Sequence, residues 1–156
     1  MQNGMENANI IYRKIEGQPD PLDISKLTKL YSEIFTDADI EFFKQRISAH
    51  LDIYTILAFD NDNLIGFKIG YPYNKTTFYS WIGGVKSTYR NQGIASSLAK
   101  FQEDFAKKGG FEKLRTKSMN TFKPMMILNL KNGFDIVKFY TNTKGQTKIV
   151  FEKNLD

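Results

Sequence analysis

The first part of the chain changes its hydrophobic period once, from that of a strand to that of a helix. Residues 9–16 alternate apolar and charged side chains like a short strand, and the sequence GQPDP ends the pattern. From Asp23 to Phe35 the apolar residues fall at helical spacing. Residues 36–39 then indicate a cap and an acidic first turn for a second helix, which reaches about His50. We therefore expect one strand followed by two helices.

Three runs of β-branched and aromatic residues follow. They cover residues 53–59, 64–71 and 77–85, and the loop sequences DNDN and PYNK separate them. Residues of this kind favour strands, and short polar connections of this kind are typical of hairpins. The pattern predicts a three-stranded antiparallel meander.

The last part of the chain returns to mixed helices and strands. After the polar sequence KSTYRNQG, residues 94–108 place Ile94, Leu98, Phe101 and Phe105 on one helical face, and two glycines end the helix. A strand over 112–118, a short helix over 122–131 and two strands around the turn NTKG follow. This order predicts an α/β (α+β) domain.

Length and composition restrict the class of protein. The chain has 156 residues, 41% of them apolar and 14% aromatic, which fits one domain over residues 1–156 and excludes a disordered chain. No apolar run is long enough to cross a membrane, and the N-terminal sequence lacks the features of a signal peptide, so we expect a cytoplasmic protein. The absence of cysteine excludes disulfides, thiolate metal sites and cysteine nucleophiles, and we expect no metal.

The charge of the chain favours an anionic partner. Lys and Arg number 22 against 17 Asp and Glu, which gives a formal net charge of +5. Such an excess suits nucleic acid or a phosphorylated cofactor. Basic residues dominate the C-terminal half, with Lys100, Lys107, Lys108, Lys113, Arg115, Lys117, Lys123 and Lys131 against Glu103, Asp104 and Glu112. We expect the anion site in that half.

The segment between Val85 and Leu98 has the character of an anion site. A loop that leaves a strand and enters a helix presents backbone N–H groups at the positive end of the helix dipole. Gly93 would let that backbone approach a ligand closely. The chain has neither the Gly-Lys-Ser/Thr of a phosphate loop nor a G-x-G-x-x-G sequence, which disfavours kinases, NTPases and Rossmann proteins. On these grounds alone a purely structural turn stays open.

The sequence RNQGIA at residues 90–95 resembles a known motif. It fits the Arg/Gln-x-x-Gly-x-Gly/Ala motif of the GCN5-related N-acetyltransferase (GNAT) superfamily, with Val85 five residues ahead of Arg90. Asn120, the short helix after it and the sequence KNGF at 131–134 resemble the second cofactor segment of that family. The resemblance implies a mixed, mostly antiparallel sheet of about six to seven strands with about four helices over residues 1–156.

The resemblance also implies a cofactor and a reaction. In this family the loop amides, here those of residues 92–96, hold the pyrophosphate of acetyl-CoA, and the strand that ends at Val85 pairs with the pantetheine arm. The thioester would lie between that strand and the one ending near Ser118, where an acceptor amine attacks it directly. The cofactor-binding residues implied for this chain are Val85, Arg90, Gln92, Gly93, Ile94, Ala95, Ser96 and Asn120.

The chain departs from the family at the positions that handle protons. Asn129 stands where the family often has the tyrosine that protonates the departing thiolate. Tyr79 stands where some members have a Glu base, and a phenol with an ordinary pKa near 10 is a poor base at neutral pH. A water relay, a base from the N-terminal half, or binding of an acyl-CoA without efficient turnover all stay open.

The remaining candidates have structural interpretations. We expect His50, the only histidine, to cap a helix end as a cation, and Tyr79 and Trp81 to pack in the core or line a pocket. Met119, Met125 and Met126 should fill the core. The sequence leaves open which small-molecule or peptide amine is the acceptor and whether the chain forms a homodimer. The alternative function is a non-catalytic module that binds acyl-CoA or nucleic acid, of which nucleic acid is disfavoured.

Overall fold

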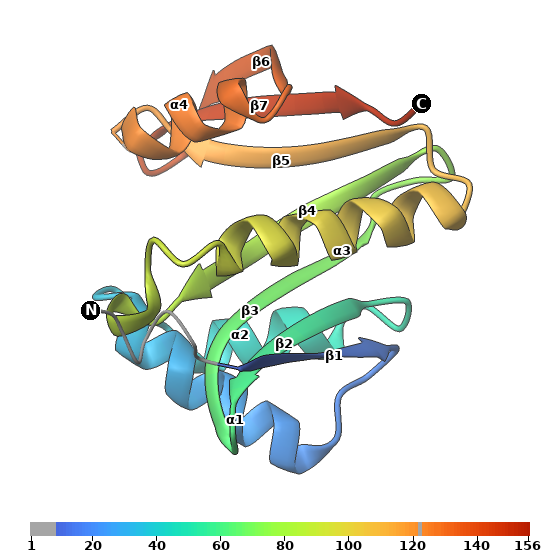
Figure 1. Ribbon diagram of the computed structural model, residues 1–156. Helices are drawn as coiled ribbons and strands as arrows, with labels where there is room; N and C mark the ends of the chain where they lie inside the picture. Colours follow the sequence, from blue (N-terminus) through green and yellow to red (C-terminus); the bar gives the residue numbers. More distant parts are fainter. Residues whose placement is uncertain (1–8, 122) are drawn as a thin grey trace. The chain divides into compact units, whose positions relative to one another are not determined.

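The computed structural model describes residues 9–121 and 123–156, which form seven strands, four α-helices and one short 3-10 helix (Figure 1). The strands are β1 (Ile10–Glu16), β2 (Tyr54–Asp60), β3 (Asn63–Pro72), β4 (Thr77–Val85), β5 (Lys113–Met119), β6 (Asp135–Thr141) and β7 (Thr147–Asn154). The helices are α1 (Pro21–Ile34), α2 (Ile40–Ser48), the 3-10 helix η2 (Ser87–Tyr89), α3 (Ile94–Lys108) and α4 (Lys123–Lys131). Phe122, expected at the start of the last helix, lies outside the described residues.

Each helix and strand expected from the sequence is present, with small differences at the ends. The helix expected from Asp23 begins at Pro21, because the Asp20 carboxylate accepts the Asp23 N–H at 2.8 Å and proline suits a first helical turn. The second helix ends at Ser48 rather than near His50. Among the described residues no helix has the length and apolar character needed to cross a membrane.

The strands form a mixed sheet in the order β1-β2-β3-β4-β5-β7-β6. The pairs β1/β2, β2/β3, β5/β7 and β6/β7 are antiparallel. The pair β4/β5 is parallel and joins Thr77–Tyr79 to Lys113–Arg115. A parallel pair needs a crossover, and α3 supplies it. The expected mixed, mostly antiparallel sheet is confirmed.

The chain divides into two compact units. The first comprises Met1–Tyr71 and Ile82–Gln102, and the second comprises Pro72–Trp81 and Glu103–Asp156. Strand β4 and helix α3 each contribute residues to both units. The single domain expected over residues 1–156 stays a prediction.

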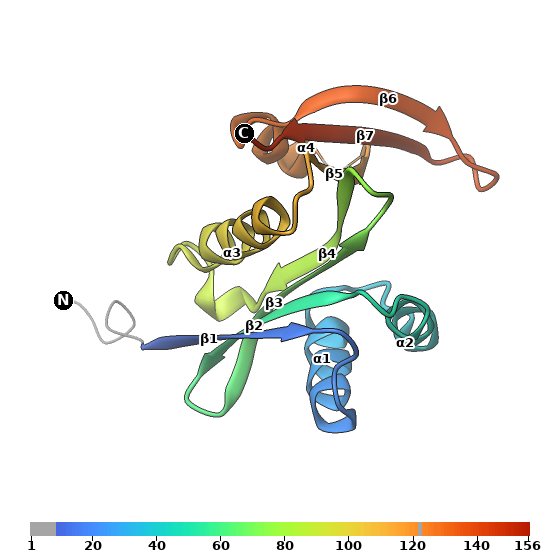
Figure 2. The same cartoon turned by 90° about the vertical axis from the view of Figure 1, so that its right-hand side faces the viewer.

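The first unit has helices on both faces of its strands (Figure 2). On one face, Tyr31 of α1 stacks on Phe43 of α2 at 4.2 Å between ring centroids, and Phe43 meets Phe67 of β3 at 6.2 Å. On the other face, Phe101 of α3 packs against Tyr12 of β1 at 5.1 Å. Burial of these aromatic rings holds the start of α3 on the sheet.

The second unit has its core between α3 and the sheet. Phe78 of β4, which is fully buried, lies 5.9 Å from Phe105 of α3 and 5.4 Å from Phe111. An ion pair of 2.7 Å between Lys153 of β7 and Glu103 holds the same helix on this face. In Figure 2, β6 and β7 run side by side as a hairpin, and their register shifts between Ile136 and Lys138.

The expectation that the methionines fill the core is wrong for Met125. Its side chain is 49% exposed, and Met119 and Met126 are only half-buried. Helix α4 is apolar on all sides and buries only Asn129, so most of its apolar side chains remain uncovered.

The expectation that His50 caps a helix as a cation is also wrong. Its ring stacks on Tyr71 at 3.6 Å between centroids, and the Arg46 Nε–H donates to the Tyr71 hydroxyl at 3.0 Å. Burial, and then the neighbouring Arg46 guanidinium, lower the pKa of His50 below its ordinary value. The residue is therefore a neutral packing partner of Tyr71.

This lowered pKa predicts a pH-dependent stability. Because the unfolded chain binds a proton at His50 more readily than the folded one, the free energy of unfolding contains a contribution that is fully present above pH 6.5 and falls as the pH drops below it. We expect His50→Gln to remove this contribution. Urea unfolding of both proteins at about pH 7.5 and about pH 5.5 measures it. An equal pH dependence in the variant would contradict the assignment.

Candidate functional site

The connection from β4 to α3 is tied to the first unit at three points. The Lys86 N–H donates to the Ile65 carbonyl at 2.8 Å, and the Lys86 ammonium lies 3.5 Å from the Glu33 carboxylate. The Tyr89 hydroxyl donates to Asp60 at 2.5 Å, and this bond is the main cause that raises the pKa of Tyr89. These contacts fix the path of the chain from Val85 through η2.

Two residues of the loop adopt left-handed backbone conformations. Asn91 has φ +64° and Gly93 has φ +80°. Asparagine and glycine adopt this conformation most readily. The Gly93 carbonyl accepts the Ser97 N–H at 3.0 Å, which makes Gly93 the N-terminal cap of α3. Gly93 was expected at this position from the sequence, whereas the left-handed Asn91 was not, although asparagine beside a turn is a signal for this geometry.

The loop presents a row of backbone amides to solvent. Within the part of the chain that the structure describes, the N–H groups of residues 91–96 have no hydrogen-bond acceptor. Gly93 is exposed, and a Cβ built on it would meet no atom within 4 Å. Unpaired amides, the helix dipole and open space are the features that favour an anion, and the anion site stays a prediction.

Gln92 adds a side-chain donor to this loop. Its Nε2 is buried and has no hydrogen-bond partner among the described residues. A buried amide without a partner costs about 1–3 kcal/mol, and Gln92 shares this lack of a partner with buried atoms of Thr55, Gln102 and Arg115 outside the loop. The sequence analysis considered only the Gln92 backbone.

The start of α3 is held by a close approach to β3. Ile94 is buried, and a Cβ on Gly66 would lie 3.4 Å from the Ile94 Cγ2. Ile94 is therefore an anchor whose side chain faces the sheet. Ala95 and Ser96, which follow it, are exposed, as is Arg90 before it, and Val85 is half-buried at the end of β4.

The other predicted site residues belong to the second unit. Asn120 is exposed, and both its backbone carbonyl and its side-chain oxygen accept from the Lys123 ammonium, at 2.8 and 3.1 Å. Tyr79 is buried on β4, with the Lys117 ammonium 5.9 Å from its ring centroid. Asn129 is buried on α4. The part that Asn120 and Tyr79 take in the site stays a prediction.

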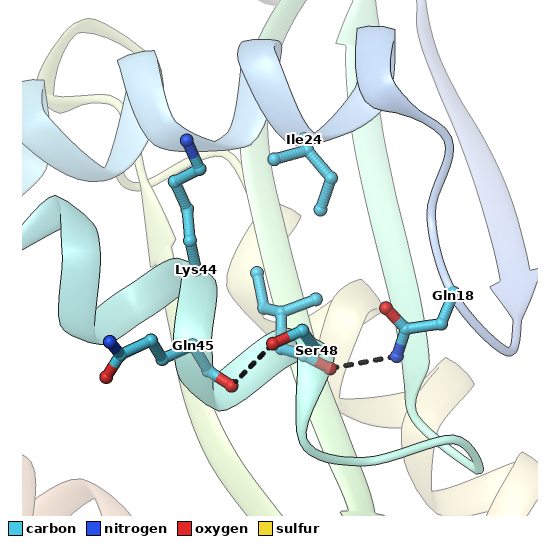
Figure 3. Close-up of a pocket in the computed structure, with 6 residues that line it drawn as sticks. Gln18, Ile24, Lys44, Gln45 and Ser48 are labelled. Atoms are coloured by element: carbon cyan, nitrogen blue, oxygen red, sulfur yellow. Dashed lines mark hydrogen bonds between the residues drawn. The ribbon is translucent and has the colours of Figure 1, made fainter.

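The first unit also contains a cavity of about 320 Å³ beside α1 and α2 (Figure 3). Its lining residues are Gln18, Ile24, Lys44, Gln45, Ile47 and Ser48. The Gln18 amide donates to the Ile47 and His50 carbonyls, and the Ser48 hydroxyl donates to Gln45. Because these polar groups satisfy one another, the cavity offers little to orient a ligand.

The described residues contain no cluster of side chains suited to a metal ion. Over residues 9–121 and 123–156, no group of three or more His, Cys, Asp or Glu side chains could hold a metal ion.

A mixed sheet with a strand-to-helix loop whose amides have no acceptor among the described residues defines an α/β protein with an open helix start. The chain belongs to the acetyltransferase (GNAT) family, whose model matches residues 23–134. It is an acetyltransferase.

Solved structures agree with this fold. A GNAT-family acetyltransferase from Elizabethkingia anophelis with acetyl-CoA bound is 23% identical, with 94% of this chain and 99% of that chain covered and a TM-score of 0.74. Arabidopsis thaliana NAA60 in complex with acetyl-CoA is 21% identical, with 94% and 99% covered and a TM-score of 0.75. The ribosomal-protein-S18-alanine N-acetyltransferase from Escherichia coli is 14% identical, with 94% and 95% covered and a TM-score of 0.76. No curated protein matches the sequence.

We expect Gly93→Val to abolish acetyl-CoA binding. The branched side chain would occupy the open space beside the loop amides, and φ +80° would strain it by about 1–3 kcal/mol. Gly110→Val is a matched control, because Gly110 has φ +86° and equally open surroundings at the other end of α3. Isothermal titration with acetyl-CoA measures the difference, and a folded Gly93→Val protein that binds like the wild type would contradict the site.

We expect Arg90→Ala to weaken acetyl-CoA binding by about 1–3 kcal/mol, the range for loss of a charge-assisted contact. Arg90 is exposed beside the amide row, so its charge can face the ligand. Arg90→Lys, which keeps the charge, should lose less. Equal affinity of Arg90→Ala and wild type at low salt would remove Arg90 from the site.

Proposed function

We propose that the loop between β4 and α3 holds acetyl-CoA by its pyrophosphate while the acetyl group passes directly to an amine. The observation that carries this proposal is the row of amides over residues 91–96 without acceptors in the described structure, next to open space at Gly93. Unpaired N–H donors at the positive end of a helix complement the negative charge and the oxygen acceptors of a pyrophosphate.

The residues of the loop would bind and orient the cosubstrate. When bound, acetyl-CoA supplies an activated thioester. The N–H groups of residues 92–96 would donate hydrogen bonds to the pyrophosphate oxygens, and Arg90 would add a positive charge beside them. The Gln92 side-chain amide would gain the partner it lacks. Val85, at the end of β4 in the same unit, belongs to the proposed set. Transfer would then depend mainly on placing the amine and the thioester in contact.

The chain offers no strong acid or base for this transfer at the two family positions. Asn129 cannot donate an acidic proton, and its side chain makes no hydrogen bond within the described residues. Tyr79, the one catalytic candidate from the sequence, is buried beside Lys117. We propose that the amine reaches the site already neutral and attacks the thioester carbonyl. Coenzyme A then leaves as its thiolate, and water takes the proton that the nitrogen loses.

The same proposal covers the chemical class of the acceptor, the oligomeric state of the protein and its cellular location. The neighbour named for ribosomal-protein-S18 alanine supports a peptide amine, with a small-molecule amine as the second class. The edge strand β6 exposes Ile136, Val137 and Phe139, the last by 72%, which supports a homodimer. A cytoplasmic location is also proposed, supported by the finding that no described helix is long and apolar enough to cross a membrane.

Calorimetric titration is the direct test of this function. Acetyl-CoA and free coenzyme A should bind with similar affinity, because both carry the pyrophosphate that the loop would hold. Thiol release in the presence of a panel of peptide and small-molecule amines should then identify the acceptor. Absence of acetyl-CoA binding by the folded protein would contradict the proposal.

A non-catalytic acyl-CoA module is the second candidate. The observation that favours it is Asn129 at the position of the family tyrosine. Binding of acetyl-CoA without thiol release for any amine would support this candidate over the enzyme.

We expect Asn129→Ala to retain most of the acetyl transfer, because the neutral amide is a weak substitute for a general acid that is worth about 10²–10⁴-fold. Asn129→Tyr should transfer at an equal or higher rate if the buried position admits the ring. Turnover with the identified acceptor measures both, and Asn154→Ala, at an exposed position at the end of β7, is the control. A thousandfold loss in Asn129→Ala, with fold and acetyl-CoA affinity intact, would make Asn129 catalytic.

A further inference from the structure

The sheet of the second unit has one strongly basic face. The registers of β5, β7 and β6 place a set of side chains on it, and we call this set the lysine face: Lys113, Arg115, Lys117, Lys138, Tyr140 and Lys148. Glu152 and Asp135 are the acidic residues that the same registers add. The face therefore has a clear excess of positive charge.

The helices of this unit lie on the other face of the sheet. Lys153, which neighbours Glu152 and so points the other way, pairs with Glu103 of α3 at 2.7 Å. Gly133, just after α4, lies near the same side chain, because its Cβ would be 3.5 Å from the Lys153 Cε. Neither α3 nor α4 covers the lysine face.

Three of its lysines are not neutralised by the protein. Glu152 lies 2.9 Å from Arg115 and 3.7 Å from Lys113 and so engages both. Among the residues that the structure describes, Lys117, Lys138 and Lys148 have no acidic partner. Lys117 and Lys138 are exposed, so both charges are accessible from solvent.

Two tyrosines hold the Lys117 and Lys138 ammonium groups in place. The Lys117 ammonium lies 5.9 Å from the Tyr79 ring centroid and 5.6 Å from that of Tyr140. The Lys138 ammonium lies 5.6 Å from the Tyr140 centroid. Both lysines pair with Val150, which is fully buried. Positioned charges lose less side-chain entropy when they bind an anion.

The geometry and the charge fit an extended acidic peptide. Residues on one face of a strand repeat about every 6.6–6.8 Å, which is also the repeat of alternate side chains in an extended peptide. We propose that the lysine face docks an acidic segment of the acceptor polypeptide. This assignment rests on the proposed transfer to a peptide amine and names the class of its substrate.

Two observations disfavour nucleic acid on this face. Single-stranded nucleic acid gains affinity by stacking its bases on exposed aromatic rings. The ring of Tyr140 already faces two lysines, and Tyr79 is buried.

The test measures binding of a short fluorescent peptide in which glutamate alternates with serine, in the absence of acetyl-CoA. We expect Lys117→Glu/Lys138→Glu to weaken binding about tenfold or more by fluorescence anisotropy at low salt. Lys107→Glu/Lys108→Glu at the end of α3 changes the net charge equally and should bind like the wild type. The milder Lys117→Gln/Lys138→Gln gives an intermediate affinity and guards against misfolding of the reversed variant.

A peptide in which lysine replaces glutamate should prefer the Lys117→Glu/Lys138→Glu protein over the wild type. Equal losses in the two charge-reversed variants would overturn the proposal, because they would reflect net charge alone. Tighter binding of a single-stranded oligonucleotide than of the acidic peptide would overturn it in favour of nucleic acid. Because acetyl-CoA is absent, these outcomes are independent of cosubstrate binding and of the test of the proposed function.

Discussion

The first amides of any α-helix have no acceptor within the helix, and the structure around α3 depends on how this chain uses that constraint. Most helices satisfy these amides with a capping side chain, as Asp20 and Asp39 do for α1 and α2. Helix α3 instead begins at a glycine that has no side chain to offer. Its amides stay open to solvent, which leaves them available to a ligand with matching charge.

The surroundings of α3 hold this unsatisfied helix start in place. Ile94 docks against the sheet where Gly66 leaves room, and the preceding segment is tied down through Lys86 and Tyr89. These contacts use the Ile94 side chain, the Lys86 N–H and the Tyr89 hydroxyl, none of which is an amide of the row. The stability of the helix start and its capacity to bind an anion therefore rest on different atoms, which allows the amides to remain unpaired.

The sequence predicted the fold and the loop well, because both follow from local patterns. The strand and helix periods and Gly93 at the helix start needed no tertiary information. The neutral state of His50 depends on Tyr71 and Arg46, which the fold brings to it from elsewhere in the chain. The unpaired Gln92 amide and the exposure of Met125 likewise depend on packing. The lysine face could not be predicted from the sequence, because the register of β6 shifts between Ile136 and Lys138. This shift puts Asp135 and Lys138 on one face, whereas simple alternation would put them on opposite faces.

The tie between Tyr89 and Asp60 connects the loop to the far end of β2. Asp60 closes the hairpin into β3, so a movement of the loop away from the helix start would also disturb the hairpin. A ligand that binds the loop only while the Tyr89–Asp60 hydrogen bond is formed raises the free energy of every local opening that breaks this bond. Amide hydrogen exchange at the β2–β3 hairpin should therefore report occupancy of the helix start, although no residue of the hairpin belongs to the proposed site.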